Sequence, residues 1–393
     1  MIFGFKPEKI RKDFPSIGKG IYFDSACMSL KPMQVIEKMQ EYYMQYPACA
    51  GRSVHKFGKR LEDEIDKARR EVAKFINSRE KEIVFTKNAT EALNLVANSI
   101  ELNKGDEIII TDKEHSSNII PWLKLKKEKG ILIRYCESNE DGSFNLEKFK
   151  GLFSNKTKLV SVLHVSNIDG YENPVEDIIK ISSKNKVRVM IDACQSVPHK
   201  KIDVKRIDCD FLAFSGHKML GPTGTGVLYG KKEELEKLKM FIVGGETIID
   251  ANFDDFKPEE IPARFEAGLQ NYSGIIGLGE ACRYLNKIGM DNVEKHEEKL
   301  NKIIYEGLKD YVEVLGSNGG IFNFNIKGMT HHEVAKILDS GYGIMVRSGA
   351  HCVHEWYNKH KLNGSVRASF YLYNTEDEAR KFVEAVKEIS KLS

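Results

Sequence analysis

The chain has 393 residues, of which 41% are hydrophobic and 30% are charged, a composition typical of a globular enzyme. With 60 basic and 57 acidic residues the formal net charge is only +3, and no basic run stands alone, so nucleic acid is not expected as a partner. The longest apolar stretches are strand-sized and the N-terminus has no apolar h-region, so neither a membrane span nor a secretory signal is predicted.

The seven cysteines are scattered along the chain, and none of them forms a CxxC pair. An odd number without such pairs favours neither a disulfide framework nor a zinc ribbon. A reducing cytoplasm is therefore the expected location.

From about Glu82 onward, short β-rich runs alternate with helical segments. The predicted strands are Glu82–Thr86, Glu107–Thr111, Ile131–Cys136, Lys158–His164, Arg188–Asp192, Phe211–Phe214 and Gly226–Tyr229. The helical patterns between them are Thr90–Ile100, Ile119–Lys129 and Val175–Lys184. Several of the strands are almost continuously apolar, as buried parallel strands are. The alternation predicts a layered α/β domain with its ligand at the carboxyl ends of the strands.

After about Ile275 the pattern changes to that of a smaller α+β unit. The predicted helices are Ile275–Lys287, Asn292–Leu308, Thr330–Asp339 and Thr375–Lys391, and the predicted strands are Val312–Leu315, Gly320–Ile326, Ile344–Arg347 and Ser365–Tyr371. We expect a large domain over residues 16–284 and a small domain over residues 285–393 that also includes residues 1–15. The acidic, proline-containing segment Asp254–Pro262 is predicted to be a loop.

One lysine, Lys218, follows an apolar strand and stands beside Ser215 and His217, with a glycine-rich stretch after it. A lysine at a strand end among hydroxyl and imidazole groups is a candidate Schiff-base nucleophile. Ser215 and His217 could bind a phosphate or orient the lysine. An ordinary surface lysine is the alternative, because most lysines are surface residues. The residues at the other strand ends have to distinguish these two interpretations.

Polar side chains stand at three of those strand ends. The segment Thr86–Glu91 opens a helix whose free N–H groups would bind a phosphate, although an ordinary helix cap is the alternative. Asp192 ends a buried run and would pair with a protonated pyridine nitrogen, unless it faces solvent. Gln195 could donate to a ring oxygen or be a plain loop amide. His115 could stack on an aromatic ring and move protons, unless it is an ordinary loop histidine.

A second reactive group is predicted near the C-terminus, where Cys352 follows His351 in a loop. Loop cysteines beside imidazoles can act as nucleophiles, and an inert small residue is the alternative. Farther along, Arg367 on a predicted strand suits bidentate capture of a carboxylate, or a surface salt bridge. The histidines around the cysteine fit no closed zinc pattern, so no metal site is predicted.

Together these motifs resemble the class V, fold type I pyridoxal phosphate (PLP) enzymes and, more narrowly, the Suf-type or group II cysteine desulfurases. The segments that carry the resemblance are Asp24–Ala26, Asn88–Ala92, His164–Asn167, Asp192–Gln195, Phe214–Gly221, Arg264–Gly268, Arg347–Cys352 and Arg367. The resemblance implies a large domain with a mainly parallel seven-stranded sheet and a smaller α+β C-terminal domain that carries the Cys352 loop. The short interval from Cys352 to Arg367 matches group II.

The resemblance also implies a role for each residue. Lys218 would bind the cofactor as an internal aldimine and exchange it for the substrate amine. Cys352 would attack the substrate sulfur and become a persulfide while alanine leaves. Asp192 would pair with the pyridine nitrogen, Gln195 would contact the ring oxygen, and His115 would stack on the ring and assist proton transfer. The implied phosphate ligands are Thr90, Ser215 and His217, and Ala89 is a further implied cofactor-binding residue. The implied substrate-binding residues are His55, Asn167, Arg347 and Arg367.

The chain departs from the family pattern at several positions. Leu269 stands where the family has a threonine that reaches the phosphate in the neighbouring subunit, and leucine cannot donate that hydrogen bond. Cys27 stands where alanine is common, and Ala350 where relatives often carry a polar side chain. The loop after the cysteine, His354–Tyr357, also differs from the usual pattern.

The leading hypothesis is a homodimeric PLP-dependent desulfurase that converts L-cysteine to L-alanine. It would pass sulfur from Cys352 to an acceptor or scaffold protein for iron–sulfur cluster assembly. A selenocysteine lyase or a cysteine sulfinate desulfinase is the nearest alternative. A non-catalytic sulfur or metal carrier is a third interpretation, but a carrier would need neither Lys218, Asp192 nor His115.

Overall fold

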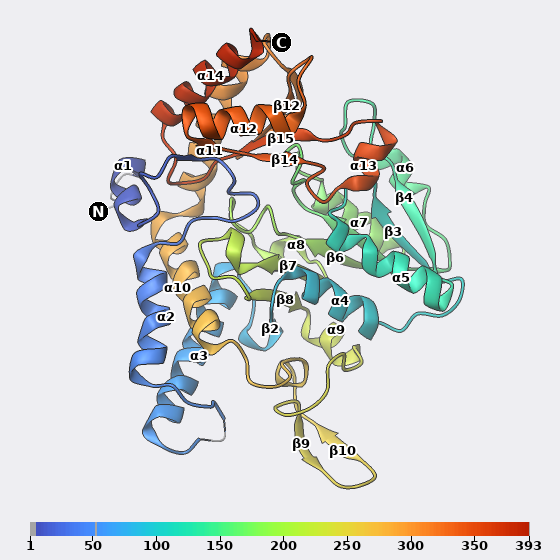
Figure 1. The fold of residues 1–393 in the computed structure, drawn as a ribbon. Helices are drawn as coiled ribbons and strands as arrows, with labels where there is room; N and C mark the ends of the chain where they lie inside the picture. The colour runs from blue at the N-terminus through green and yellow to red at the C-terminus, as the bar shows by residue number, and fades with distance from the viewer. Residues whose placement is uncertain (1–4, 52, 393) are drawn as a thin grey trace.

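The structure is a computed structural model that describes residues 5–51 and 53–392. A seven-stranded sheet forms the centre of the molecule (Figure 1). Its strands, in spatial order, are β2 (Ile83–Thr86), β8 (Gly226–Gly230), β7 (Phe211–Ser215), β6 (Arg188–Asp192), β5 (Thr157–Leu163), β3 (Glu107–Thr111) and β4 (Leu132–Cys136). All seven correspond to predicted strands, with ends that differ by one residue at most.

The direction of the strands explains where the site lies. Strands β3 to β7 pair in parallel, and β8 is antiparallel to both of its neighbours, so β2 runs the same way as β7. The carboxyl ends of β2, β3, β5, β6 and β7 therefore meet at one edge of the sheet. This confirms the expected mainly parallel seven-stranded sheet.

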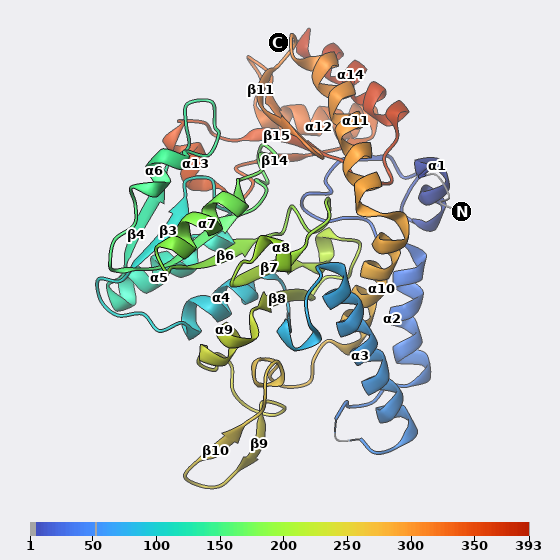
Figure 2. The same cartoon turned by 180° about the vertical axis from the view of Figure 1, so that it is seen from behind.

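Helices cover both faces of this sheet, as Figures 1 and 2 show from opposite sides. On β3, Ile108 and Ile110 pack into one core cluster with α4 (Ala89–Ser99) and α5 (Ile120–Lys129), whereas Ile109 packs into another with α7 (Val175–Lys184). Successive strand side chains point to opposite faces, so an apolar run on one strand serves two cores. The shorter helices are α1 (Pro7–Ile10), α6 (Leu146–Lys150), α8 (Val204–Ile207), α9 (Lys232–Lys237) and α13 (His354–Lys359).

A layer of three long helices lies along one side of the molecule (Figure 1). Helices α2 (Met33–Gln45) and α3 (Lys56–Phe75) pack against α10 (Tyr272–Ile288). A Cβ on Gly279 of α10 would lie 2.6 Å from the Cα of Ala68 on α3, so only glycine allows this close approach. The sequence predicted most of α10 but neither α2 nor α3.

The smaller sheet has four antiparallel strands, in the order β11 (Glu313–Asn318), β12 (Ile321–Asn325), β15 (Ser365–Ser369) and β14 (Arg347–Gly349). Helices α11 (Met290–Leu308), α12 (His331–Tyr342) and α14 (Glu376–Ser390) accompany it. Phenylalanines of β12 and α14 share its core. The expected strand Ile344–Arg347 is divided, because β13 (Ile344–Met345) pairs with β1 (Ile21–Tyr22) instead of joining this sheet.

The division into two domains near residue 285 stays a prediction, and residues 1–4 of the N-terminal part lie outside the described residues. Gly289 separates α10 from α11, which continues toward the small sheet. Among the described residues, no helix is both long and apolar enough to cross a membrane.

The segment Asp254–Pro262 was expected to be a loop, and this was wrong in part. Strand β9 (Ile248–Ala251) pairs with β10 (Phe256–Pro258), and the hairpin projects from the body of the molecule (Figure 1). The side chain of Asn252 accepts from the backbone N–H groups of Asp254 and Asp255, both at 2.8 Å. This Asx turn closes the hairpin, which explains why acidic turn residues here join two strands.

Candidate active site

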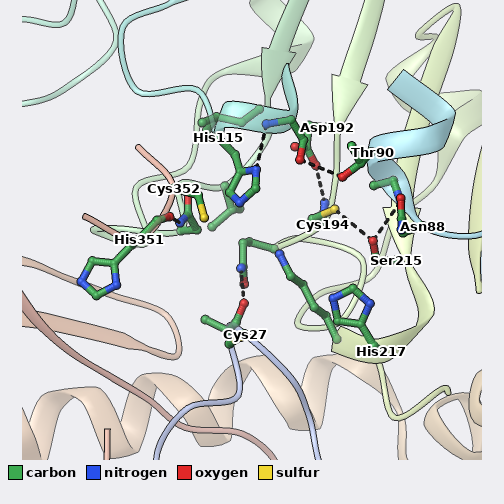
Figure 3. Close-up of a pocket in the computed structure, with 18 of the residues that line it drawn as sticks. Cys27, Asn88, Thr90, His115, Asp192, Cys194, Ser215, His217, His351 and Cys352 are labelled. Atoms are coloured by element: carbon green, nitrogen blue, oxygen red, sulfur yellow. Dashed lines mark hydrogen bonds between the residues drawn. The ribbon is translucent and has the colours of Figure 1, made fainter. Parts of the chain in front are cut away.

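A cavity of about 210 Å³ opens where the carboxyl edge of the large sheet faces the small sheet (Figure 3). Every residue that the sequence nominated lines it, except His55. The lining residues are Ala26, Cys27, Asn88, Ala89, Thr90, His115, Ser117, Leu163, Val165, Asn167, Asp192, Cys194, Gln195, Ser215, His217, Lys218, Arg347, His351, Cys352 and Arg367.

Lys218 ends a short 3-10 turn that follows β7 directly. The backbone of this turn is held by its neighbours, because the carbonyl oxygen of His217 accepts from the N–H of Ser29 and from Lys31 Nζ, both at 3.0 Å. A Cβ on Gly216 would lie 2.3 Å from the hydroxyl of Thr225, so the turn needs glycine there. The lysine is therefore presented to the cavity by a backbone with little freedom.

The N-terminus of α4 forms one wall of the cavity. Its N-cap, Asn88, accepts from the backbone N–H of Glu91 at 2.9 Å, and Ser215 Oγ accepts from the N–H of Ala89 at 2.9 Å. The hydroxyls of Thr90 and Ser117 are hydrogen-bonded at 2.8 Å. A helix N-terminus with hydroxyl groups around it is a suitable site for a phosphate.

Asp192 ends β6 and Gln195 lies just after it, and each has a polar group free to bind a ligand. Asp192 is 5% exposed, accepts from the N–H of Cys194 at 3.0 Å, and forms no ion pair within the part of the chain that the structure describes. Gln195 Nε2 donates to the carbonyl of Ala26 at 2.8 Å, while its Oε1 is buried without a partner among the described residues. A buried carboxylate without a cation fits a protonated pyridine ring, because an unpaired buried charge is costly.

His115 lies after β3, on the same side of the cavity as Asp192 (Figure 3). Burial, followed by the charge of Lys218, lowers the pKa of His115 from 6.5 to about 4, so the ring is neutral at pH 7. Its Nδ1 accepts from the backbone N–H of Ser117 at 3.1 Å. The single ring proton is therefore on Nε2. Burial and the charge of Lys218 likewise lower the pKa of His217 to about 4.

The exposed residue Cys352 is held in position by the large sheet's loops. Its carbonyl oxygen accepts from the backbone N–H of Ser116 at 2.7 Å and from Ser116 Oγ at 2.8 Å. Asn167 Nδ2 donates to the carbonyl of His351 at 2.8 Å. His351 and Cys352 have φ angles of 49° and 60°, a left-handed conformation that is uncommon for residues other than glycine. These contacts hold the strained turn in place.

Two arginines on neighbouring strands complete the cavity. Arg347 on β14 and Arg367 on β15 lie opposite each other in register. Arg367 is 2% exposed, donates from Nη1 to the carbonyl of Asn167 at 2.9 Å, and lies 3.4 Å from Asp24. Its Nε has no partner among the described residues. A buried guanidinium with a free donor fits an anionic ligand group such as a carboxylate.

The structure does not bring His55 to the cavity of its own chain. His55 is exposed and caps α3, where its Nδ1 accepts from the N–H of Gly58 at 3.3 Å. Its predicted role in substrate binding stays a prediction. Leu269 is also outside the cavity and is 65% exposed.

Some lining residues were not nominated from the sequence, including Cys27, Ser117 and Cys194. Cys27 directly follows the segment Asp24–Ala26, Cys194 lies within Asp192–Gln195, and Ser117 is two residues from His115, so sequence proximity was the available signal. Within the described ranges, no three histidine, cysteine or acidic side chains are grouped so that they could hold a metal ion.

Comparison with known proteins extends over almost the whole chain. Residues 21–382 match the model of the aminotransferase class-V family. A probable cysteine desulfurase of Pyrococcus abyssi is 43% identical, covering 98% of both chains. A probable cysteine desulfurase of Synechocystis sp. is 41% identical, covering 96% of this chain and 94% of the relative.

Solved structures agree with these sequence matches. The apo cysteine desulfurase of Thermococcus onnurineus superposes with a TM-score of 0.95 at 40% identity and 98% coverage of both chains. The cysteine desulfurase CsdA of Escherichia coli, solved with an S-sulfonic acid, superposes with a TM-score of 0.93 at 31% identity and 99% coverage of both. The chain belongs to the aminotransferase class-V family.

Proposed function

We propose that this member of the class-V family is a PLP-dependent cysteine desulfurase, which converts L-cysteine to L-alanine and keeps the sulfur as a persulfide on Cys352. The observation that carries the proposal is that Lys218 and Cys352, which come from different sheets, line one cavity. An amine and a thiol with phosphate, pyridine and carboxylate ligands around them are the parts that this reaction needs.

The residues at the carboxyl edge of the large sheet would hold the cofactor. PLP, when bound, supplies an aldehyde that reacts with amines and a ring that accepts electrons. Asp192 would hold the proton on the ring nitrogen, Gln195 would donate to the ring oxygen, and His115 would pack on the ring face. The phosphate would lie at the N-terminus of α4, held by Ala89, Thr90, Ser215 and His217.

The two arginines would bind the substrate carboxylate. Arg367 has a free Nε donor and Arg347 lies beside it in register, so a carboxylate between them would gain charge-assisted hydrogen bonds. Asn167 would support this subsite, because it contacts both Arg367 and the cysteine loop. The carboxylate would then place the substrate sulfur on the side of Cys352.

The chain supplies the proton transfers and the sulfur nucleophile. Lys218 Nζ would take the proton from the substrate α-carbon, and the neutral His115 would donate from Nε2. The thiolate of Cys352 would attack the substrate sulfur, so that an S–S bond forms and the carbon–sulfur bond breaks. The carbon keeps the electron pair of the broken bond and takes a proton, which yields alanine.

Further aspects of the proposal concern assembly and partners. His55 could reach a bound substrate only across a subunit contact, because it lies outside its own cavity. Large apolar side chains are also exposed, among them Val54, Phe253 and Leu269. Both observations support a homodimer. The compact cysteine loop supports the group II type, with an iron–sulfur scaffold or carrier protein as the sulfur acceptor.

We also place the protein in the cytoplasm. All seven cysteines are free thiols, which a reducing compartment favours.

Alanine release from L-cysteine tests the proposal. The purified protein should show a visible absorption band that cysteine alters, and Lys218→Ala should lose both the band and the activity. Cys352→Ala should keep the band and lose cysteine turnover. Rates with selenocysteine and cysteine sulfinate would identify the two alternative activities if either exceeded that with cysteine. Undiminished cysteine turnover by Cys352→Ala would contradict the persulfide mechanism.

A further inference from the structure

The candidate active site contains a second thiol that the proposed reaction does not use. Cys27 is half-buried and lines the same cavity as Cys352. Its Sγ lies 2.9 Å from Arg347 Nη1, which donates a hydrogen bond to it.

Arg347 connects Cys27 with Cys352 electrostatically. Although burial opposes the charge of Arg347, the negative charges of Cys27 and Cys352 are among those that raise its pKa above the usual value. Arg367 lines the same cavity as Arg347 and the two cysteines. A guanidinium favours the thiolate form of a cysteine, and the thiolate is the nucleophile.

Cys194 also lines the cavity but has the opposite environment. It is buried, its Sγ lies 3.8 Å from Ser215 Oγ, and burial together with the charge of Asp192 raises its pKa well above the usual value. A thiol in such surroundings is inert. Of the three cysteines in the cavity, Cys27 is the one whose sulfur accepts a hydrogen bond from an arginine.

We propose that Cys27 is a second sulfur-carrying residue, which takes the outer sulfur from the persulfide of Cys352. The inference rests on the proposed desulfurase function. The thiolate of Cys27 attacks the outer sulfur, so a new S–S bond forms on Cys27 while the bond between the outer sulfur and Cys352 Sγ breaks. The electron pair of the broken bond leaves on Cys352 as a thiolate, and the proton of the persulfide stays on the transferred sulfur. No external oxidant or reductant is needed, because one persulfide replaces another.

This transfer returns Cys352 to its reactive form before any acceptor protein arrives. Each chain then stores two sulfur atoms, one on each cysteine. The store gives a clear signature, because without acceptor or reductant every sulfur retained corresponds to one alanine released.

The experiment is a burst measurement on the holoenzyme, with excess L-cysteine, no acceptor and a quench that alkylates thiols. Wild type should release about two alanines per chain in the burst, and Cys27→Ser and Cys27→Ala about one. Peptide mass mapping should find one added sulfur atom on the Cys27 peptide of the wild type. Cys352→Ala should carry no sulfur on Cys27, because the donor is missing. Cys49→Ser, which removes an exposed thiol outside the cavity, is the matched control and should keep the two-alanine burst.

Different outcomes separate this inference from the proposed function. A burst of one alanine with sulfur only on Cys352 would overturn the role of Cys27 and leave the desulfurase intact. The role of Cys27 would also be overturned by two sulfur atoms found together on the Cys352 peptide, or by an unchanged burst in both Cys27 variants. Absence of any alanine from the wild type would instead contradict the proposed function itself.

Discussion

Asn167 and His351 are 184 positions apart in the sequence, yet the side-chain amide of Asn167 donates a 2.8 Å hydrogen bond to the backbone carbonyl of His351. Asn167 lies in the loop after strand β5, and His351 directly precedes Cys352. The bond therefore joins the carboxyl edge of the large sheet to the loop that carries Cys352, the proposed sulfur nucleophile.

Replacing this donor should slow sulfur transfer. In Asn167→Asp the carboxylate cannot donate and faces the His351 carbonyl, a loss of about 1–3 kcal/mol. We expect alanine release under single turnover to fall roughly 5- to 150-fold while the cofactor absorbance stays unchanged. Asn173→Asp is the matched control, because Asn173 donates to the carbonyl of Leu163 and does not touch the cysteine loop. Equal losses in the two variants would show that the contact with the loop has no special role.

Neutralising Asp192 should damage the chemistry far more than it damages the fold. Asp192→Asn removes the charge that would keep the ring nitrogen protonated, so we expect alanine release at saturating PLP to fall roughly 10²–10³-fold. The visible spectrum of the bound cofactor should change as well. Asp208→Asn, on an exposed left-handed residue where asparagine is tolerated, should be unaffected. Activity within twofold of wild type for Asp192→Asn would remove Asp192 from the proposed site.

The ion pair between Arg69 and Glu266 should contribute strongly to stability. Arg69 donates to both carboxylate oxygens of Glu266, at 2.9 and 2.8 Å, and the N–H of Phe85 donates to the same carboxylate at 2.7 Å. Glu266→Gln leaves a mostly buried arginine without its counter-charge, which should cost about 3 kcal/mol and lower the thermal midpoint. Glu147→Gln breaks an exposed pair with Lys150 and should cost less than about 1 kcal/mol. Similar thermal midpoints for the two variants would contradict a strong contribution of the Arg69–Glu266 ion pair to stability.

Acid should destabilise the protein through His351. Burial, followed by the charges of Arg367 and Arg347, lowers the pKa of His351 from 6.5 to about 2. Below pH 6.5 the unfolded chain binds a proton at this histidine that the folded protein does not bind. The contribution of the neutral His351 to the free energy of unfolding is therefore complete above pH 6.5. As the pH falls toward 2, this contribution decreases by about 1.4 kcal/mol for each pH unit.

Denaturant midpoints at pH 7 and pH 5 measure this effect. The loss of stability between the two pH values should be smaller for His351→Gln than for wild type. The exposed His360 offers the control, and His360→Gln should keep the wild-type difference. If both variants keep that difference in full, another group is responsible for the acid sensitivity.

The parallel strands and the polar residues at their ends could be predicted because each is a local pattern. An apolar run such as Arg188–Asp192 is a strand buried on both faces, and the polar residue that ends it must lie at the carboxyl edge. Helices α2 and α3 escaped prediction, although α3 has a well-formed apolar face, because charged residues dominate its sequence. Strand β10 was missed because the acidic, proline-containing residues around it indicated a loop.

The sequence by itself determined the chemistry: which residues can react, bind a phosphate or pair with a ring, and that most of them end parallel strands. Only the tertiary structure decided which residues share a cavity across two sheets. Arg347 lies beside Cys27 and Arg367 lies beside Asp24, although no sequence period relates positions more than 300 residues apart. His55, in contrast, lies outside the cavity of its own chain. The physical reason is that local patterns specify strands and helices, whereas these contacts depend on how the small sheet packs against the edge of the large one.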